Sequence, residues 1–231
     1  MPEDLIAGHL TPWRVWNRGG ARPLLALHCS LAHSGAWTGL AGLLSDVTVT
    51  ALDQPSHGRS ADWDGVEDLH GLTTRISVAM AETLADDGRV DLIGHSFGAT
   101  VALRIALERP DLVRSLVLIE PVIFAAANGG SVYDDFRAGH LGFAELVLAG
   151  KRAEAAALFH GVWGTGDDFA DLPEKTSRYM RDRIHLIEAQ NPVLLDDTAG
   201  ILRPGALETV AVPVLLIDGA DSPSIIEAVH G

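Results

Sequence analysis

The sequence predicts an α/β fold in which a mainly parallel sheet carries helices on both faces. Short runs rich in Val, Leu and Ile alternate with longer stretches whose apolar residues recur at helical spacing. The short runs are apolar almost throughout, as in strands that are buried on both faces of a sheet. After residue 120 the alternation stops, and no strand-like run appears until residue 212. This change indicates a helical insertion within one α/β domain.

Length and composition are those of a globular protein. The chain has 231 residues, 47% of them hydrophobic and 21% charged, which suits one domain with a buried core. Asp and Glu number 31 against 17 Lys and Arg, so the formal net charge is -14. Because a surface of this sign repels phosphate backbones and anionic head groups, we expect neither a nucleic acid nor a membrane as a partner.

The sequence contains no sign of a membrane anchor, a metal site or a bound cofactor. No apolar run approaches the roughly 20 residues that span a bilayer. The acidic start Met1-Pro2-Glu3-Asp4 does not resemble a signal peptide, so the cytoplasm is the expected location. The one cysteine, Cys29, excludes cysteine-rich metal clusters, and no other group of residues has metal-ligand spacing. No glycine-rich nucleotide loop follows a strand, and we expect no metal and no cofactor.

Six apolar runs are predicted to be the strands: residues 13–16, 24–28, 47–53, 90–94, 115–120 and 214–218. A helix is predicted over residues 69–84, where Leu72, Ile76 and Met80 share one face. Another is predicted over residues 96–108, because its apolar residues follow the same spacing and Pro110 prevents it from continuing.

The insertion is also expected to be helical. Residues 153–163 are rich in strong helix formers. A longer helix is predicted to open at Leu172-Pro173 and to end at Asn191-Pro192. A last helix begins after Pro223. The predicted domains are a core of residues 1–120 and 206–231 and a helical cap of residues 121–205.

One motif carries the chemistry of a serine nucleophile. Gly94-His95-Ser96-Phe97-Gly98 stands between a predicted strand and a predicted helix, which is the context that gives the G-x-S-x-G pattern its meaning. The sharp turn needs glycine on both sides because a side chain there would clash with neighbouring backbone. It lifts the Ser96 hydroxyl above the carboxyl edge of the sheet. The amide of Phe97 and the positive end of the helix then face a developing oxyanion.

Two further motifs accompany this one. Leu27-His28-Cys29-Ser30 ends an earlier strand and is followed by Trp37, and the turn that begins at Asp53 reads Asp-Gln-Pro-Ser-His-Gly-Arg-Ser. The motifs together resemble those of the α/β-hydrolase family. The resemblance implies a mostly parallel, doubly wound sheet of the α/β-hydrolase type with an inserted helical cap.

The resemblance can be carried over residue by residue. It implies that Ser96 is the nucleophile and that the backbone amides of Ser30 and Phe97 form the oxyanion hole. Cys29 stands where the family usually has glycine, and we interpret it as a small buried hydrophobe. His28 is interpreted as a brace for its loop and not as a proton carrier.

The acid of the expected triad has several candidates. Glu120 ends one strand, where some members of the family keep their acid, and Asp221 follows a later strand. The family's usual acid in that later turn stands at the position of Ser222, so Asp221 is one residue early. Asp218, in the same turn, is a third candidate, and the sequence leaves the choice open.

The sequence lacks an obvious general base. The family's catalytic histidine lies on a loop after one further strand, whereas the sequence stops at Gly231 within a helix. His230 is expected on the surface of that helix. The cap histidines His140, His160 and His185 precede the later acid and lie in no motif. We expect the final strand and its histidine loop to follow Gly231; the other interpretation is a protein without a normal triad.

The resemblance implies a serine hydrolase that cleaves a small, mainly apolar ester, thioester or related carbonyl substrate through an acyl-enzyme. Trp37, Phe124 and Trp163 are expected to bind this small-molecule substrate in an apolar pocket. Ser96 argues against the family members that use an aspartate nucleophile. Two alternatives stay open: a non-catalytic ligand-binding or scaffold protein of the same fold, and a lyase or cofactor-free haloperoxidase on the same triad. The sequence does not determine the oligomeric state.

Overall fold

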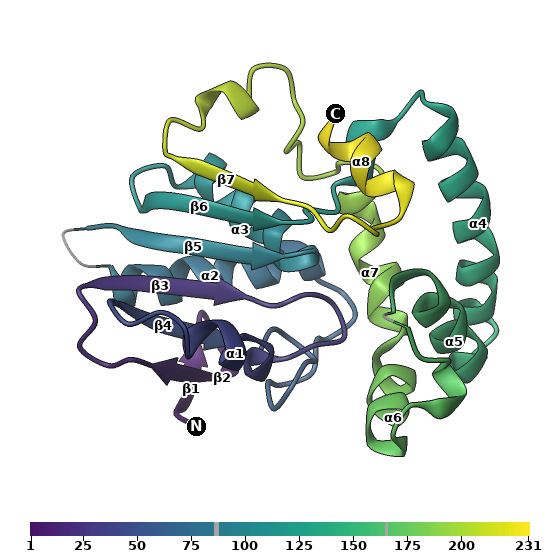
Figure 1. The fold of residues 1–231 in the computed structure, drawn as a ribbon, viewed down its shortest axis with the longest axis horizontal. Helices are drawn as coiled ribbons and strands as arrows, with labels where there is room; N and C mark the ends of the chain where they lie inside the picture. The colour runs from purple at the N-terminus through teal and green to yellow at the C-terminus, as the bar shows by residue number, and fades with distance from the viewer. Residues whose placement is uncertain (86–87, 165) are drawn as a thin grey trace. The chain divides into compact units, whose positions relative to one another are not determined.

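The chain folds into two compact units. The computed structural model describes residues 1–85, 88–164 and 166–231 (Figure 1). Unit 1 comprises Met1–Val122 and Asp197–Ile217, and unit 2 comprises Ile123–Asp196 and Asp218–Gly231. The division into a core of 1–120 and 206–231 and a cap of 121–205 stays a prediction.

Unit 1 is built on a seven-stranded sheet in the order β1-β2-β4-β3-β5-β6-β7. The strands are β1 (Glu3–Ile6), β2 (His9–Trp16), β3 (Arg22–Leu27), β4 (Val47–Leu52), β5 (Val90–His95), β6 (Val113–Ile119) and β7 (Val214–Ile217). The β1–β2 and β2–β4 pairs are antiparallel, and all other pairs are parallel. The mainly parallel sheet expected from the apolar runs is confirmed.

The first strand was not predicted from the sequence. Its residues are largely exposed, including Leu5 at 68%, so no apolar run marks it. β1 pairs with β2 as a hairpin, and the connecting residues Ala7 and Gly8 have φ values of 50° and 84°. Two successive positive φ values are typical of the tight turns that join antiparallel strands. The hairpin therefore depends on turn geometry and not on burial.

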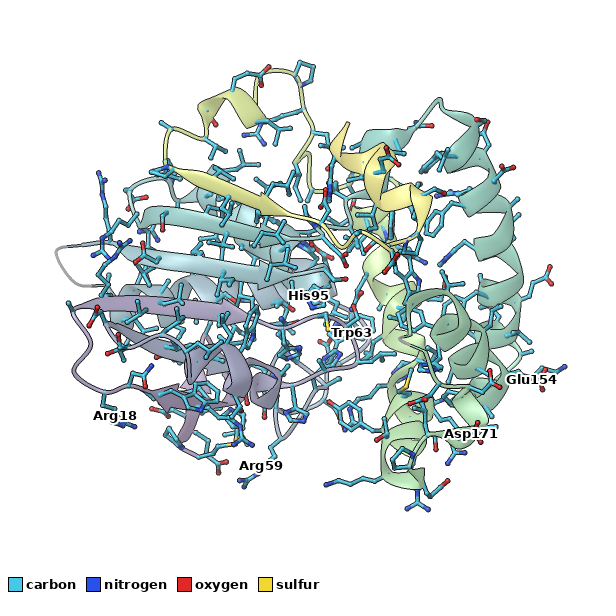
Figure 2. The ribbon with its side chains drawn as sticks, in the orientation of Figure 1. Arg18, Arg59, Trp63, His95, Glu154 and Asp171 are labelled. Carbon is cyan, nitrogen blue, oxygen red and sulfur yellow. The ribbon has the colours of Figure 1, made fainter. Side chains whose placement is uncertain are left out.

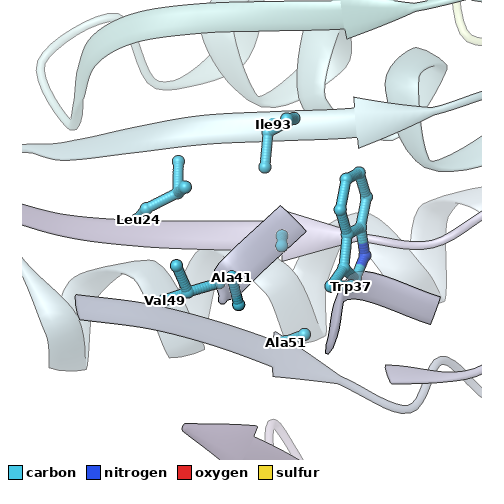
Figure 3. Packing of buried hydrophobic residues seen from close by; sticks show 7 residues of the cluster. Leu24, Trp37, Ala41, Val49, Ala51 and Ile93 are labelled. Carbon is cyan, nitrogen blue, oxygen red and sulfur yellow. The ribbon is translucent and has the colours of Figure 1, made fainter. Parts of the chain in front are cut away.

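Helices cover both faces of this sheet. α2 (Leu69–Leu84) and α3 (Phe97–Glu108) lie on one face (Figure 1). The short helices η1 (Ser34–Trp37) and α1 (Thr38–Ala41) lie on the other. There Trp37 and Ala41 pack against strand side chains in one apolar cluster (Figure 3). The strand residues of this cluster are Leu24, Ala26, Val49, Ala51 and Ile93.

Unit 2 is helical. Its helices are η2 (Phe124–Ala127), α4 (Ser131–Leu148), α5 (Arg152–Trp163), η3 (Phe169–Asp171), α6 (Glu174–Arg183), α7 (His185–Leu194) and α8 (Ser224–His230); η4 (Leu207–Thr209) belongs to unit 1. Among the residues described, no helix combines the length and the apolar character needed to cross a membrane.

The single helix expected between Leu172-Pro173 and Asn191-Pro192 is wrong, because the chain forms two helices there. α6 ends before Ile184, and the amide of Ile187 bonds to the carbonyl of Ile184 at 3.2 Å, three residues back. This tighter turn lets both isoleucines be buried, with exposures of 0% and 8%. α7 continues through Pro192 to Leu194, so the proline lies in its last turn.

Helix α3 packs unusually close to the sheet at Gly98. A Cβ added at this position would stand 2.2 Å from the carbonyl oxygen of Leu27 on β3. A Cβ at Gly94 would stand 2.3 Å from the carbonyl oxygen of Gly98. Gly98 itself has no positive φ, so its backbone conformation would suit alanine. Space alone excludes a side chain here.

We predict that Gly98→Ala lowers the free energy of unfolding by about 3 kcal/mol, because the clash involves backbone that cannot move aside. Gly139→Ala is the matched control, since Gly139 lies inside α4 with nothing within 4 Å of an added Cβ. There we expect a gain of about 0.5–1 kcal/mol from helix propensity. Urea denaturation followed by tryptophan fluorescence measures both. Equal effects of the two substitutions would contradict the steric argument.

Candidate active site

The expected site residues of unit 1 gather at the carboxyl ends of β3, β5 and β6. The chain passes from β3 to β4 on one side of β3 and then crosses to β5 on the other side, from where it continues to β6. The order of the strands therefore reverses at β3. A reversal of this kind opens a crevice at the strand ends, where ligands bind in open α/β sheets. The loop that holds Ser30 follows β3, Ser96 follows β5, and Glu120 follows β6.

Ser96 occupies the strained turn between β5 and α3. Its backbone has φ 54° and ψ -119°, a conformation that costs a residue other than glycine about 1–3 kcal/mol. The turn is fixed on both sides: the Ser96 amide donates to the carbonyl of Ile119 at 2.8 Å, and its carbonyl accepts from the Ala99 amide at 2.9 Å. Serine usually caps a helix with its hydroxyl, but Ser96 makes no such bond. Its hydroxyl is therefore not used to hold the start of α3.

Phe97 is the first residue of α3 and is fully buried. Its amide is one of the N-terminal amides of the helix that have no partner one turn earlier, and the helix dipole adds positive potential there. An oxygen atom that becomes negative beside Ser96 would be stabilised by this amide.

The loop after β3 is held by the turn that follows β4. The carboxylate of Asp53 accepts hydrogen bonds from the amides of Ser34 at 2.8 Å and Arg59 at 2.9 Å. Gly58, with φ 57°, leaves the space that Asp53 needs, because a Cβ there would lie 2.2 Å from its carboxylate. The Asp-x-x-x-His-Gly turn recognised in the sequence thus supports the loop that carries Ser30.

His28 braces the same loop from inside. Its Nδ1 donates to the carbonyl of Cys29 at 2.8 Å, and its Nε2 accepts from the amide of Gln54 at 3.1 Å. The Gln54 side chain returns a bond to the carbonyl of His28 at 2.7 Å. Burial lowers the pKa of His28 to about 4. The ring is neutral with both nitrogens occupied, as expected of a brace and not of a proton carrier.

His57 is bonded in the same way. Its Nδ1 lies 2.9 Å from the carbonyl of Pro55, and its Nε2 accepts from the amide of Leu31 at 3.1 Å. The rings of His57 and His28 pack edge to face with centroids 5.2 Å apart. Leu31 has a positive φ of 60°, and its amide is taken up by His57. The preceding amide, that of Ser30, is the one the sequence assigned to the oxyanion hole.

Cys29 lies in this loop and is half-buried. Burial raises the pKa of its thiol to about 11, so the thiolate that reacts with electrophiles is scarce at neutral pH. The interpretation of Cys29 as a small hydrophobe fits this environment.

The three candidate acids lie in different surroundings. Glu120 is half-buried and follows β6, with a positive φ of 48° and its amide bonded to the carbonyl of Ile217 at 2.9 Å. Its carboxylate lies 3.8 Å from Nε2 of His95, which Figure 2 shows at the end of β5. Burial lowers the pKa of His95, and the nearby Glu120 opposes this effect. Asp221 is exposed in unit 2.

The third acid, Asp218, contacts a histidine. Its Oδ1 lies 2.6 Å from Nδ1 of His230, and both residues belong to unit 2. The His230 side chain is only 7% exposed. The expectation that His230 lies on a helix surface is therefore wrong, because α8 turns this residue toward the Asp218 carboxylate.

The aromatic residues expected to bind substrate fall into two places. Trp37 is 6% exposed and belongs to the core cluster of unit 1. In unit 2 the rings of Phe124 and Trp163 lie 6.0 Å apart, and both contact Phe136. Binding of substrate by these residues stays a prediction.

Sequence reasoning missed one buried residue that contacts Phe97, His70 on α2. Its ring is fully buried and meets the ring of Phe97 edge to face, with centroids 5.3 Å apart. The available signal was a polar stripe inside an otherwise apolar helix face, made by His70, Thr73 and Thr74.

The chain is similar to a family model and to solved structures of one family. A model described as "Alpha/beta hydrolase family" matches residues 24–230. A solved structure of an alpha/beta hydrolase from Sphaerobacter thermophilus DSM 20745 has a TM-score of 0.72 at 21% identity, covering 98% of this chain and 84% of that one. The likeness confirms the fold class expected from the sequence.

Two curated relatives carry names of activities. Lipase LipV of Mycobacterium tuberculosis is 34% identical over 154 residues, which cover 64% of this chain and 54% of the relative. Pimeloyl-(acyl-carrier protein) methyl ester esterase of Nitrosomonas europaea is 36% identical over 104 residues, which cover 44% of this chain and 38% of the relative. The chain thus spans about half or less of the length of these relatives.

The buried neutral state of His28 predicts a pH dependence of stability. Its pKa is about 4 in the folded protein against 6.5 ordinarily, so between these values the unfolded chain binds the extra proton. Protonation therefore favours unfolding, and the free energy of unfolding should fall as the pH drops from 6.5 to 4, by about 3 kcal/mol for this group. Below pH 4 its effect levels off.

Urea titrations across this range, compared with His28→Gln, isolate the contribution of this one ring. In the variant, the free energy of unfolding should fall less steeply as the pH drops from 6.5 to 4. If the free energy of unfolding depends on pH in the same way in both proteins, the fold does not hold His28 neutral.

Proposed function

We propose that this chain, which belongs to the alpha/beta hydrolase family, is a serine hydrolase in which Ser96 attacks a small, mainly apolar ester, thioester or related carbonyl substrate. The observation that carries the proposal is the turn at Ser96. A serine in a strained backbone conformation, at a helix start that its hydroxyl does not cap, is explained by chemistry and not by stability.

The reaction would proceed through two acyl transfers. The Ser96 hydroxyl oxygen attacks the substrate carbonyl while a histidine base takes its proton. The carbonyl oxygen becomes an oxyanion and accepts hydrogen bonds from the amides of Ser30 and Phe97. The alcohol or thiol then leaves with the proton from the base, and an acyl group stays on Ser96. A water molecule attacks this acyl group, releases the carboxylic acid and restores the serine.

The base itself is not assigned to a residue of this sequence. His28 and His57 use both ring nitrogens to hold the loop after β3, so neither has a nitrogen available for the Ser96 proton.

For the acid we propose Glu120. It follows the strand next to the one that ends at the nucleophile turn, and the register pairs Ile119 with His95. Its positive φ is a second strained position at the same edge of the sheet. Asp221 stands one residue before the position at which the family usually keeps its acid in the later turn.

The class of substrate is supported by the relatives. One is named a lipase and the other a methyl ester esterase, and both names describe cleavage of esters. A lyase or a cofactor-free haloperoxidase on the same triad would share the activated serine, and product analysis with ester substrates separates them.

A fluorophosphonate probe should label Ser96 in the native protein, including any residues that follow Gly231 there, because this probe reacts with activated serines. Ser96→Ala should stay unlabelled, and tryptic mass spectrometry locates the modified residue. A folded native protein that stays unlabelled would refute the hydrolase and favour a ligand-binding or scaffold protein of the same fold.

Three matched amide variants identify the acid. Glu120→Gln should lower kcat on a short-chain nitrophenyl ester by about 10³–10⁴-fold, because the base histidine then loses the carboxylate that orients it. Asp221→Asn and Asp218→Asn should stay within about tenfold of the unmodified protein. A large loss in Asp221→Asn together with an active Glu120→Gln would reassign the acid.

A further inference from the structure

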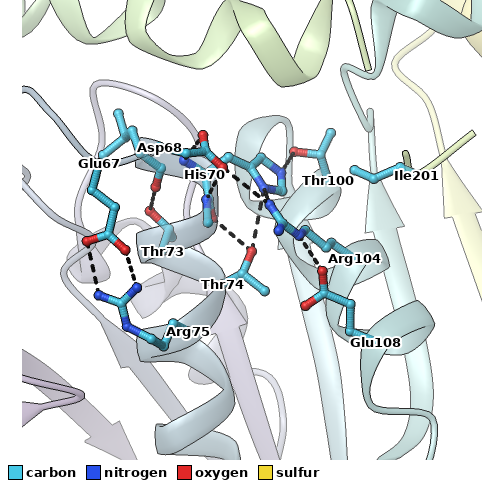
Figure 4. A network of polar contacts seen from close by, with 12 residues as sticks. Glu67, Asp68, His70, Thr73, Thr74, Arg75, Thr100, Arg104, Glu108 and Ile201 are labelled. Atoms are coloured by element: carbon cyan, nitrogen blue, oxygen red, sulfur yellow. Dashed lines mark hydrogen bonds and ion pairs between the residues drawn. The ribbon is translucent and has the colours of Figure 1, made fainter. Parts of the chain in front are cut away.

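A buried polar network joins helix α2 to the residue after the nucleophile. His70 lies in the first turn of α2, which Asp68 caps by accepting from the amides of His70 and Gly71. Nε2 of His70 lies 3.1 Å from Oγ1 of Thr100, one turn along α3 from the nucleophile (Figure 4). Both His70 and Thr100 are completely buried.

The directions of these hydrogen bonds follow from the number of hydrogens. Thr100 has one hydroxyl hydrogen, and the 2.7 Å distance to the carbonyl oxygen of Phe97 uses it. The Thr100 oxygen must then accept from His70, so the proton of the neutral ring is on Nε2. Nδ1 is left as an acceptor and lies 3.3 Å from Nη1 of Arg104.

Arg104 ends the network and is held by two carboxylates. Arg104 Nε donates to Glu108 at 2.7 Å, and its Nη1 lies 3.5 Å from Asp68. Burial first, and then the Arg104 charge, lower the pKa of His70 to about 3. The ring therefore stays neutral. Arg104 donates to His70, His70 donates to Thr100, and Thr100 donates to the carbonyl of Phe97.

We propose that His70 and Thr100 are positioning residues of the oxyanion hole: they fix Phe97 so that its amide faces the oxyanion that forms at Ser96. The ring edge contact holds the Phe97 side chain, and the Thr100 bond holds its carbonyl. The Phe97 amide shares a peptide plane with the Ser96 carbonyl, which accepts from the amides of Ala99 at 2.9 Å and Thr100 at 3.2 Å. With this plane and the rest of Phe97 held, the direction of the amide is set before substrate binds. An oxyanion donor acts through such preorganisation, since a small misplacement weakens its bond to the transition state. This inference rests on the proposed function.

Thr100→Val tests the proposal, because it keeps the shape of the side chain and removes the hydroxyl. In the native protein we expect kcat per active site, counted by fluorophosphonate titration, to fall about tenfold while KM changes less than about twofold. Affinity for a boronic acid, which mimics the tetrahedral intermediate, should weaken by the same factor. Thr100→Ser restores the hydroxyl and should recover most of the loss.

Thr73→Val is the control for a purely structural effect. Thr73 is equally buried and also donates to a backbone carbonyl, that of Leu69 at 2.7 Å (Figure 4), but this bond lies within α2. Its substitution should change thermal stability without changing kcat per titrated site. If Thr100→Val does not fold, His70→Gln and His70→Leu ask the same question, with the donor kept in the first and lost in the second.

The outcomes separate the two proposals. Turnover per site in Thr100→Val equal to that in Thr73→Val would overturn the positioning role while leaving the serine hydrolase intact. A native protein that is folded, unlabelled and without turnover would overturn the proposed function and the positioning role with it. The amide resonance of Phe97 in a nitrogen–proton correlation spectrum should shift in Thr100→Val and stay in place in Thr73→Val.

Discussion

The geometry of the candidate site depends on how closely helix α3 packs against β3 and β5. Position 98 has room only for hydrogen, because the carbonyl of Leu27 stands where a Cβ would lie. Between β5 and this helix the chain turns at Ser96, whose backbone has φ 54° and ψ -119°. The same packing sets the helix start beside the loop after β3. Close backbone contact therefore sets where the turn at Ser96 lies at the edge of the sheet.

Polar side chains buried beneath the loop after β3 complete this arrangement. Asp53, His28 and His57 each bond to backbone groups of the loop or of the turn that supports it. A buried polar group without a partner would destabilise the fold, so these pairings stabilise one loop conformation against others. The pairings also occupy both ring nitrogens of His28 and of His57.

Sequence patterns predicted the parts of the fold that follow from burial. The inner strands and α2 were found because their apolar residues are periodic. β1 was missed because its side chains are exposed and its turn is the only local signal. The break near Ile184 was missed because Tyr179, Met180, Ile184 and Ile187 keep one helical spacing across it. The candidate site residues were chosen from motifs that are continuous in the chain. His70 and Thr100, by contrast, are 30 positions apart and meet only through the packing of two helices. The acid could not be chosen for a similar reason, since its identity depends on a histidine that no motif locates.

Ser96 and Glu120 both hold backbone conformations that glycine would adopt with less strain. A redesign of this chain for thermal stability alone would therefore favour glycine at both positions and remove the two side chains proposed for catalysis. Stabilised variants of the protein need these two positions held constant, and stability should be sought elsewhere in the chain.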